Sequence, residues 1–442
     1  MEDQYLYYIS QSEIKRLINS LYQAYYNIPQ IKVSINLSIS HYTGKEISYS
    51  SIRKVYDYLK DNKYINYKLG SEYSGKVTRI SASGKLTRKF DKIGFIWRKN
   101  NNPTENLILF KDKKKTLDNV KITNQIIKYK NNISKINEEL LKHCLCLKIS
   151  DQSFKELEKE LRKKQNEKPK YFWRENNHYT LNFSQVSLRR IFTRKIGLHG
   201  RFYGGWWQSV PSKFRPHITI DGYNTSEVDY STNSLRILYA RENITVDDDI
   251  DLYDIGISNY NPEKRDLIKE YTNAIINDPK GNFRLDNKSL SKLGLNHNKL
   301  KDMVYKTHER INKYFGVEDE GLKVMYLDSR IAEDILLNLL KNKVVVLPIH
   351  DSFIVRTSHR LDLEYQMNKS FKKIMGVKGK IKSTGPISYK MFNKGNEPAD
   401  LTDIKFKYIE DKNSNESINK DEFKRYYKYL DNWNEWKRSN PS

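Results

Sequence analysis

The hydrophobic and polar positions of the chain follow helical spacing in some segments and strict alternation in others. Residues 47–65 place four large side chains three or four positions apart, at Ile52, Val55, Tyr56 and Leu59. This spacing predicts an amphipathic helix, and the serines within 48–51 offer its N-cap. Residues 65–83 then alternate in two short runs around glycine and serine, which is typical of a β-hairpin.

Three further helices are predicted by the same spacing. In residues 261–278, Asn261 can cap a helix whose first residue is Pro262. Residues 317–342 place four apolar side chains on one face that we expect to be buried: Ile331, Ile335, Leu336 and Leu339. Residues 421–440 form an amphipathic helix whose aromatic side chains are predicted to dock on the rest of the protein.

Two predicted hairpins carry aspartates at strand ends. Residues 342–357, NKVVVLPIHDSFIVRT, combine an apolar strand, a tight polar turn at His350 and Asp351, and a second apolar strand. Residues 217–240 alternate around an Asp-Gly turn, and Asp229 ends the second strand. The segment then changes to helical spacing through Leu235.

The charge balance predicts a polyanionic partner. The chain has 79 Lys and Arg against 54 Asp and Glu, a formal net charge of +25. A low-GC codon bias would enrich lysine, but it does not require so few acids, so we expect the protein to bind nucleic acid. Cys144 and Cys146 stand beside His143 and cannot complete a zinc site alone. They are expected to be thiols in a reducing compartment.

The cellular location follows from segments that the sequence lacks. The first thirty residues have no basic region followed by an apolar core, and no apolar run reaches the length of a membrane span. We therefore expect a cytoplasmic protein, or one at the host-cell nucleoid, without a membrane partner.

The amino-terminal region, residues 1–90, is predicted to bind DNA. Helices followed by a basic hairpin indicate a winged helix-turn-helix, with residues 52–61 as the recognition helix. Arg53, Lys54 and Lys60 would lie on its exposed face. The alternative is a small helical domain that uses the hairpin for protein contacts.

Three further regions follow along the chain. Residues 91–170 are basic and weakly apolar, which predicts a helical linker or a thumb-like segment. Residues 171–395 are rich in aromatic residues and better patterned, and residues 396–442 are predicted to form a helical tail.

Asp229 and Asp351 form the candidate catalytic pair. Two-metal phosphoryl transfer needs carboxylates on rigid strands that hold two Mg²⁺ ions about 3.5–4 Å apart, with Mn²⁺ as an alternative metal. Spacing alone does not establish such a site, because an aspartate at a strand end also serves as a helix cap or a turn residue.

The residues around these aspartates resemble a polymerase superfamily. VDYSTNSLRILYA is similar to motif A of family A DNA polymerases in five residues: Asp229, Tyr230, Ser231, Leu235 and Arg236. IHDSFIV resembles motif C in the form of phage-type single-subunit RNA polymerases, with His350, Asp351 and Ser352. GLHGRFYGG resembles the Gly-Arg motif that precedes motif A, at Gly200 and Arg201. The resemblance covers about 190–360.

The resemblance implies an α+β fold: a right-hand polymerase with an antiparallel palm sheet and helical fingers, here joined to the winged helix-turn-helix. It implies that Asp229 and Asp351 bind the metals and that Gly200 and Arg201 lie at the template or primer. His350 and Ser352 would support motif C, and Tyr230 would lie at the nucleotide.

A fingers helix with Arg-x₃-Lys is also implied, and two segments match it. Arg265 and Lys269 share one face of the predicted helix 261–278, where both could bind a triphosphate, with Lys269 as a general acid. Arg284 and Lys288 are the competing pair. The family places an aromatic four or eight residues past the lysine, and this chain departs from it with Asn273 and Asn277.

Sugar choice is predicted from the fifth residue after Asp229. The DNA enzymes have a glutamate there that blocks the 2′-hydroxyl, and this chain has Ser234. A serine removes that bulk and can accept a hydrogen bond from the hydroxyl. Together with Ser352, this favours ribonucleotides.

We therefore expect a template-directed nucleotidyltransferase, an RNA polymerase or primase-like enzyme, of a phage, plasmid or other mobile element. Its partners would be a DNA template, the nascent RNA or DNA strand, and nucleoside triphosphates. One alternative is a family A-like DNA polymerase for mobile-element replication. The other is a non-catalytic DNA-binding replication initiator or regulator that keeps a decayed polymerase fold.

Overall fold

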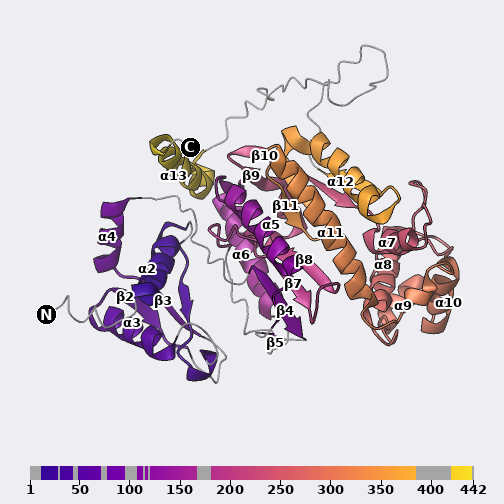
Figure 1. Cartoon of the computed structure of the whole chain (residues 1–442), viewed down its shortest axis with the longest axis horizontal. Coiled ribbons are helices and arrows are strands. Elements are labelled where there is room, and N and C mark those ends of the chain that lie inside the picture. The colour runs from indigo at the N-terminus through magenta and orange to yellow at the C-terminus, as the bar shows by residue number, and fades with distance from the viewer. Residues whose placement is uncertain are drawn as a thin grey trace, which may run out of the picture.

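The protein has a mixed α and β fold. The computed structural model describes residues 11–27, 30–42, 48–70, 77–94, 107–112, 115–117, 120–166, 181–384 and 420–440. Within these residues the strands form three sheets. Figure 1 shows an amino-terminal unit with one small sheet beside a larger body that holds the other two. No helix in the described ranges is long and apolar enough to cross a membrane.

The amino-terminal unit interleaves helices with three short antiparallel strands. In chain order its elements are α2 (Gln11–Tyr26), β1 (Val33–Ile35), η1 (Ile39–His41), α3 (Tyr49–Asp61), β2 (Ile65–Lys68), β3 (Thr78–Ala82) and α4 (Gly84–Ile93). The sheet order is β1-β3-β2, so the last strand lies between the first two.

The helix and hairpin predicted in this unit are confirmed. The Ser48 hydroxyl accepts a hydrogen bond from the Ser51 amide at 3.1 Å and caps α3. The four predicted apolar residues of α3 are its buried residues. They pack with α2 and the sheet in a hydrophobic cluster separate from that of the body.

The main sheet of the body is antiparallel and carries both candidate aspartates. Its strand order is β11 (Leu347–Ile349), β12 (Ser352–Arg356), β10 (Tyr223–Tyr230), β9 (Ile218–Ile220) and β6 (Leu145–Leu147). Strand β13 (Ile381–Thr384) also pairs with β10. The two predicted hairpins, β9–β10 and β11–β12, are both confirmed.

The second sheet of the body brings in residues that were expected to form a linker. Its order is β5 (Lys115–Thr116), β4 (Ile108–Asp112), β7 (Arg189–Thr193) and β8 (His199–Tyr203). Strands β4, β5 and β6 all come from residues 91–170, yet β4 pairs with β7 and β6 pairs with β9, both from beyond residue 180. The residues on either side of the expected boundary at 170 therefore fold together, because the fully buried run 144–147 completes the main sheet.

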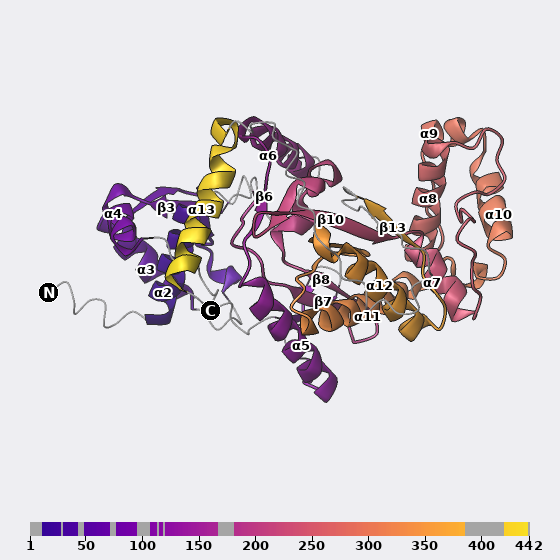
Figure 2. The ribbon, with the colours of Figure 1, turned by 90° about the horizontal axis from the view of Figure 1, so that it is seen from above.

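Helices cover these sheets and extend past one end. Helices α5 (Asn124–Leu140), α11 (Glu320–Lys341) and α12 (Arg360–Met375) pack against strands, and α7 (Asn233–Arg241) packs on α11 and α12. Helix α6 (Asp151–Asn166) follows β6. The predicted inward face of α11 is buried, as expected. Helices α8 (Pro262–Asn277), α9 (Asn287–Leu293) and α10 (His297–Thr307) lie at the end of the molecule opposite the amino-terminal unit (Figures 1 and 2).

The carboxy-terminal helix α13 (Lys424–Ser439) docks on the body as predicted. Tyr426, Tyr429 and Trp433 are buried. The Arg425 guanidinium donates to the Leu147 carbonyl at 2.7 Å and lies 4.1 Å from the centre of the Phe154 ring. This helix therefore covers the β6 edge of the main sheet.

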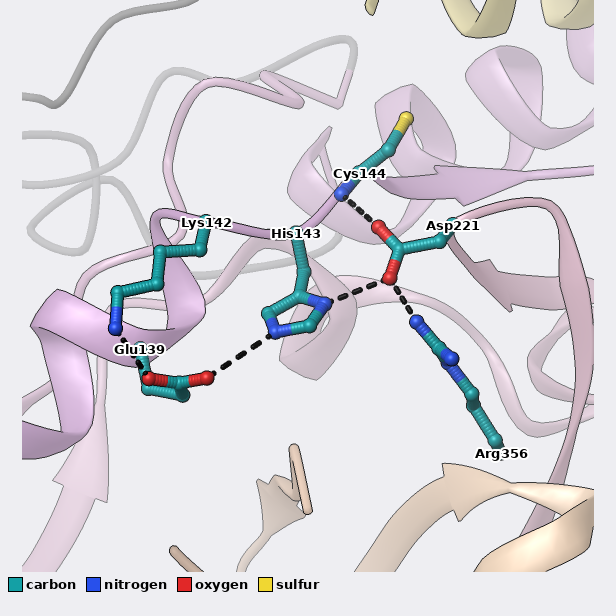
Figure 3. Close-up of polar contacts among 6 residues, drawn as sticks. All are labelled: Glu139, Lys142, His143, Cys144, Asp221 and Arg356. Atoms are coloured by element: carbon teal, nitrogen blue, oxygen red, sulfur yellow. Dashed lines mark hydrogen bonds and ion pairs between the residues drawn. The ribbon is translucent and has the colours of Figure 1, made fainter. Parts of the chain in front are cut away.

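A polar network stabilises the turn of the β9–β10 hairpin (Figure 3). Asp221 and Gly222 form the turn, both with positive φ, which is the conformation that an Asp-Gly hairpin turn requires. The Asp221 carboxylate accepts hydrogen bonds from the Cys144 amide at 2.7 Å, from His143 Nδ1 at 2.6 Å, and from the Arg356 guanidinium. It thereby joins the start of β6 to the end of β12.

Candidate active site

Asp229 lies in β10 of the main sheet, and Asp351 lies in the turn that leads into the neighbouring strand β12. Asp229 is the second-last residue of β10 and lies opposite Ser352 of β12. The next amide, that of Tyr230, donates to the Asp351 carbonyl at 3.2 Å. The two aspartates, 122 positions apart in the sequence, are thus one rung apart in the sheet.

The side chains around Asp229 divide between the two faces of the sheet. Tyr230 points into the core, where its hydroxyl donates to the Met367 carbonyl at 2.6 Å. By alternation Asp229 points to the other face, with Ser352 and Glu227. The Ser352 hydroxyl donates to Glu227 at 2.6 Å, and Arg215 pairs with the same carboxylate at 2.7 Å.

The turn before β12 sets the place of Asp351. His350 has φ +57, in the left-handed region that non-glycine residues rarely adopt. At this residue the alternation of side chains between the two faces of the sheet is interrupted. The direction of the Asp351 side chain therefore cannot be read from the alternation along β11 or β12. Loss of hydration of the imidazolium among the surrounding groups, and then the positive charge of Arg201, lower the pKa of His350.

Asp229 is a carboxyl group with an unfavourable environment. Burial, and then the negative charges of Asp351 and Glu227, raise its pKa to about 7, although Lys269 and Arg215 oppose the shift. No hydrogen bond or ion pair reaches the side chain of Asp229 or Asp351 from the described residues. Such a pair of partnerless carboxylates is stabilised by a proton or by a cation.

The donor set fits a hard divalent cation. Mg²⁺ is usually held by one or two carboxylates, while water and substrate oxygens fill its other positions. Within the described ranges, no group of three or more His, Cys, Asp or Glu side chains is arranged to hold a metal. Asp229 and Asp351 are the candidate carboxylate ligands.

A third carboxylate, Asp328 of α11, was not found by sequence reasoning. It is 2% exposed and accepts hydrogen bonds from Arg201 Nε at 2.7 Å and Asn233 Nδ2 at 2.8 Å. Burial raises its pKa to about 6. The signal was present in the sequence, because Asp328 lies three and seven positions before Ile331 and Ile335, on the apolar face of the predicted helix.

Arg201 lies between Asp328 and the candidate pair. Its guanidinium bonds Asp328, and the negative charge of Asp351 also acts on it. Gly200 shapes the backbone beneath it, with φ +77 and no room for a Cβ, which would meet the Phe192 ring at 2.7 Å. The contact predicted between Gly200, Arg201 and nucleic acid stays a prediction.

Helix α8 faces the acid pair with Lys269. As predicted, Asn261 caps this helix by accepting from the Lys264 amide at 3.0 Å. Lys269 is exposed, and its positive charge partly offsets the rise in the pKa of Asp229. In the competing pair, Arg284 precedes α9 and Lys288 lies in its first turn, so these two cations do not share a helix.

Arg265 is held by a segment that sequence reasoning did not consider. Its Nε and Nη2 donate to the two oxygens of Asp251 at 2.7 and 3.1 Å. Its guanidinium lies 5.1 Å from the centre of the Tyr253 ring. Tyr253 accepts a 3.4 Å hydrogen bond from Asn273, so an aromatic ring from another element lies beside the position where α8 itself has an asparagine.

The remaining predicted residues differ in exposure. Ser234 is half-buried in the first turn of α7, next to Asn233, which bonds Asp328. Tyr230 is buried in the core, and its predicted contact with the nucleotide stays a prediction.

The basic residues of α3 lie at its surface. Arg53 and Lys54 are exposed, and Arg53 pairs with Asp57 at 2.7 Å. Lys60 is half-buried, with its ammonium 5.9 Å from the centre of the Tyr67 ring. The predicted exposure is thus found at Arg53 and Lys54 and only in part at Lys60, and the contact of all three with DNA stays a prediction.

The solved structures that match this chain include a polymerase domain of low similarity. No protein-family model and no curated protein matches the sequence. The POL domain of Pol1 from M. smegmatis, in complex with DNA primer-template and dNTP, aligns with a TM-score of 0.31 and 10% identity. The alignment covers 84% of this chain and 65% of that chain, less than two thirds of its length. A TM-score of 0.31 does not establish a common fold.

Proposed function

We propose that this protein is a template-directed nucleotidyltransferase, a nucleic-acid polymerase with Asp229 and Asp351 as its catalytic pair. The observation that carries the proposal is the environment of these side chains. Asp229 lies in β10 and Asp351 directly before β12, and neither has a partner within the described residues. Burial, and then the charges of Asp351 and Glu227, raise the pKa of Asp229 to about 7. A structural carboxylate would be paired.

The cations around this pair have distinct proposed roles. Two Mg²⁺ ions on the aspartates would supply the charge that activates a 3′-hydroxyl and stabilises the transferring phosphate. Lys269 carries three N–H donors, and it would bind phosphate oxygens and give a proton to the leaving pyrophosphate. Arg265 would bind the triphosphate through its uncovered edge.

The other side of the pair would face the nucleic acid. Arg201, fixed by Asp328, would contact the template or primer backbone. His350 and Ser352 would hold the turn that carries Asp351. Ser234 leaves room for a 2′-hydroxyl, so we propose ribonucleotides as the preferred substrate and deoxyribonucleotides as the alternative.

The domains are proposed to divide this work. The main sheet would be the palm and α8–α10 the fingers, within residues 171–395 apart from strand β6. The rest of residues 91–170 would contribute a thumb, and residues 396–442 a docking tail. Residues 1–90 would be a winged helix-turn-helix that brings the enzyme to DNA. The order α2-β1-η1-α3-β2-β3 and the sheet order β1-β3-β2 support that assignment.

A non-catalytic DNA-binding initiator is the second candidate. Two observations favour it: Asn273 and Asn277 stand on α8 where the resembling enzymes have aromatics, and Arg265 is already paired with Asp251. Such a protein would keep the fold and bind DNA through residues 1–90 without transferring nucleotides.

Incorporation of labelled nucleotides decides between these candidates. The full chain is incubated with Mg²⁺ and either rNTPs or dNTPs, on primed and unprimed DNA templates. An enzyme incorporates label, and Asp351→Ala abolishes incorporation while Asp249→Asn, an exposed aspartate of the same body, leaves it unchanged. Tight DNA binding without incorporation by the wild type would support the initiator.

A further inference from the structure

The segment between α7 and α8 is acidic in a strongly basic protein. Five of the eight residues 247–254 are aspartates. Among them, Asp251 is bound to α8 through Arg265, whereas Asp249 is exposed to solvent. Asp249 is therefore a nearby exposed aspartate that can be compared with Asp251.

Asp251 is rigidly held. One oxygen accepts from Arg265 Nε at 2.7 Å and from the Tyr260 hydroxyl at 2.8 Å. The other accepts from Arg265 Nη2 at 3.1 Å and from the Tyr253 amide at 3.2 Å. Burial would raise the pKa of Asp251, but the bonds from Arg265 and Tyr260 outweigh it and lower the pKa, so the group stays ionised.

Tyr253 also supports the Arg265 side chain. Its ring is 2% exposed and lies against the Arg265 guanidinium, and its hydroxyl accepts from Asn273, eight positions further along α8. The charge of Asp351 also acts on Tyr253. The residue that it supports, Arg265, lies one helical turn before Lys269, whose charge acts on Asp229.

One edge of the guanidinium remains available. An arginine has five N–H donors, and Asp251 takes one from Nε and one from Nη2. No other hydrogen bond from this side chain is found within the described residues, and the side chain is 32% exposed. A guanidinium fixed along one edge and on one face presents its Nη1 edge in a defined direction.

We propose that Asp251 is a positioning residue that holds Arg265 in the orientation in which it binds the triphosphate of the incoming nucleotide. The inference rests on the function proposed above. Fixing the arginine in advance removes the entropy that a free side chain would lose when it binds a phosphate. The opposite role, a latch that blocks Arg265, would require the nucleotide to break the bonds from Arg265 to Asp251, although Nη1 is already free.

Nucleotide binding and turnover in four variants test this role. They are Asp251→Asn, the matched control Asp249→Asn, Arg265→Lys, and the double variant Asp251→Asn with Arg265→Lys. We expect Asp251→Asn to raise both the KM and the Kd for the nucleoside triphosphate about tenfold and to change kcat less than about twofold. Asp249→Asn should leave all three values unchanged.

The double variant separates positioning from a general structural role. If Asp251 acts only through its two hydrogen bonds from Arg265, Asp251→Asn should not raise KM or Kd further in the Arg265→Lys background. Lysine cannot form that pair of hydrogen bonds. Additive losses, or a fall in kcat that follows a fall in Tm, would overturn the proposal. Tighter triphosphate binding by Asp251→Asn would instead show a latch.

The failure of the proposed function can be told apart from the failure of this inference. A wild-type chain that incorporates no nucleotide on any template disproves the polymerase, and the Kd measured with a labelled nucleoside triphosphate still tests Asp251. A wild type that incorporates nucleotides, alongside an Asp251→Asn variant with unchanged KM and Kd, refutes only the role of Asp251.

Discussion

Asp221 and Asp229 lie at opposite ends of strand β10, and their environments are opposite. Asp221 accepts hydrogen bonds from a histidine, an arginine and a backbone amide, and these outweigh burial and lower its pKa. Asp229 has no such partner within the described residues, and burial together with two neighbouring carboxylates raises its pKa to about 7.

The difference separates a carboxylate that stabilises the fold from one that is available for chemistry. Asp221 joins three segments of the main sheet, so its charge is compensated within the protein itself. The charge of Asp229 is compensated only in part, by the charges of Lys269 and Arg215, which form no hydrogen bond or ion pair with it within the described residues. A half-buried carboxylate that the fold leaves without a partner is therefore the stronger candidate for a metal ligand.

The largest expected effect comes from neutralising the uncompensated pair. Asp229→Asn or Asp351→Ala should lower nucleotide incorporation at least about a thousandfold, because a metal ligand is lost. The thermal midpoint of Asp229→Asn should equal or exceed that of the wild type, since an unpaired charge is removed. Incorporation assays and thermal melts measure the two outcomes. A marked loss of stability in Asp229→Asn would show that Asp229, like Asp221, stabilises the fold, and would contradict the proposed difference between them.

The converse expectation holds for Asp221. Asp221→Asn should destabilise the fold by about 3 kcal/mol, because Arg356 and His143 lose a buried partner whose side chain is only 6% exposed. Incorporation per folded molecule should stay near the wild-type value. Urea unfolding gives the free-energy change, and an activity assay well below the transition serves as its control. A variant with wild-type stability but no activity would reverse the two roles.

The pH dependence should differ in sign between the two groups. A raised folded pKa means that the folded protein binds more protons than the unfolded chain between about pH 4 and 7, so the contribution of Asp229 to stability falls as pH rises through this window. The lowered pKa of Asp221 gives stability that is lost only as pH falls below about 4.

Magnesium should therefore stabilise the protein in a pH-dependent way. We expect Mg²⁺ to add about 1–2 kcal/mol at pH 8, where Asp229 is ionised, and close to nothing at pH 5, where a proton already neutralises it. Thermal melts with and without Mg²⁺ at both pH values test this. Asp229→Asn is the control and should show no Mg²⁺ effect at either pH.

The local elements could be predicted from the sequence because their determinants are local. The Ser48 cap and the spacing of Ile52 to Leu59 define α3, and the Asp221-Gly222 turn defines the β9–β10 hairpin. The pairing of β6 with β9 could not be predicted, because register between strands some 70 residues apart is set by the packing of the whole sheet.

The candidate site was predicted in part. The motif resemblance brought Asp229 and Asp351 together, and alternation alone would not have done so, because the left-handed His350 interrupts it. Asp328 was detectable as an acid on an apolar helix face, but its partners Arg201 and Asn233 were not. The Asp251–Arg265 ion pair could not be predicted for the same reason. Such a pair depends on where the loop before α8 folds back onto the helix, and the spacing of residues in the sequence does not determine that.

The smallest of these effects concerns sugar choice beside Asp229. Ser234→Glu should reduce rNTP use about tenfold and spare dNTP use, because the longer side chain fills the space of the 2′-hydroxyl. Competition between rNTP and dNTP on one template measures the ratio. Asn224→Glu adds the same group at the exposed Asp221 end of β10 and should leave the ratio unchanged. Equal rNTP use by wild type and Ser234→Glu would place the sugar elsewhere, and the preference for ribonucleotides would lose its structural basis even if Asp229 and Asp351 prove catalytic.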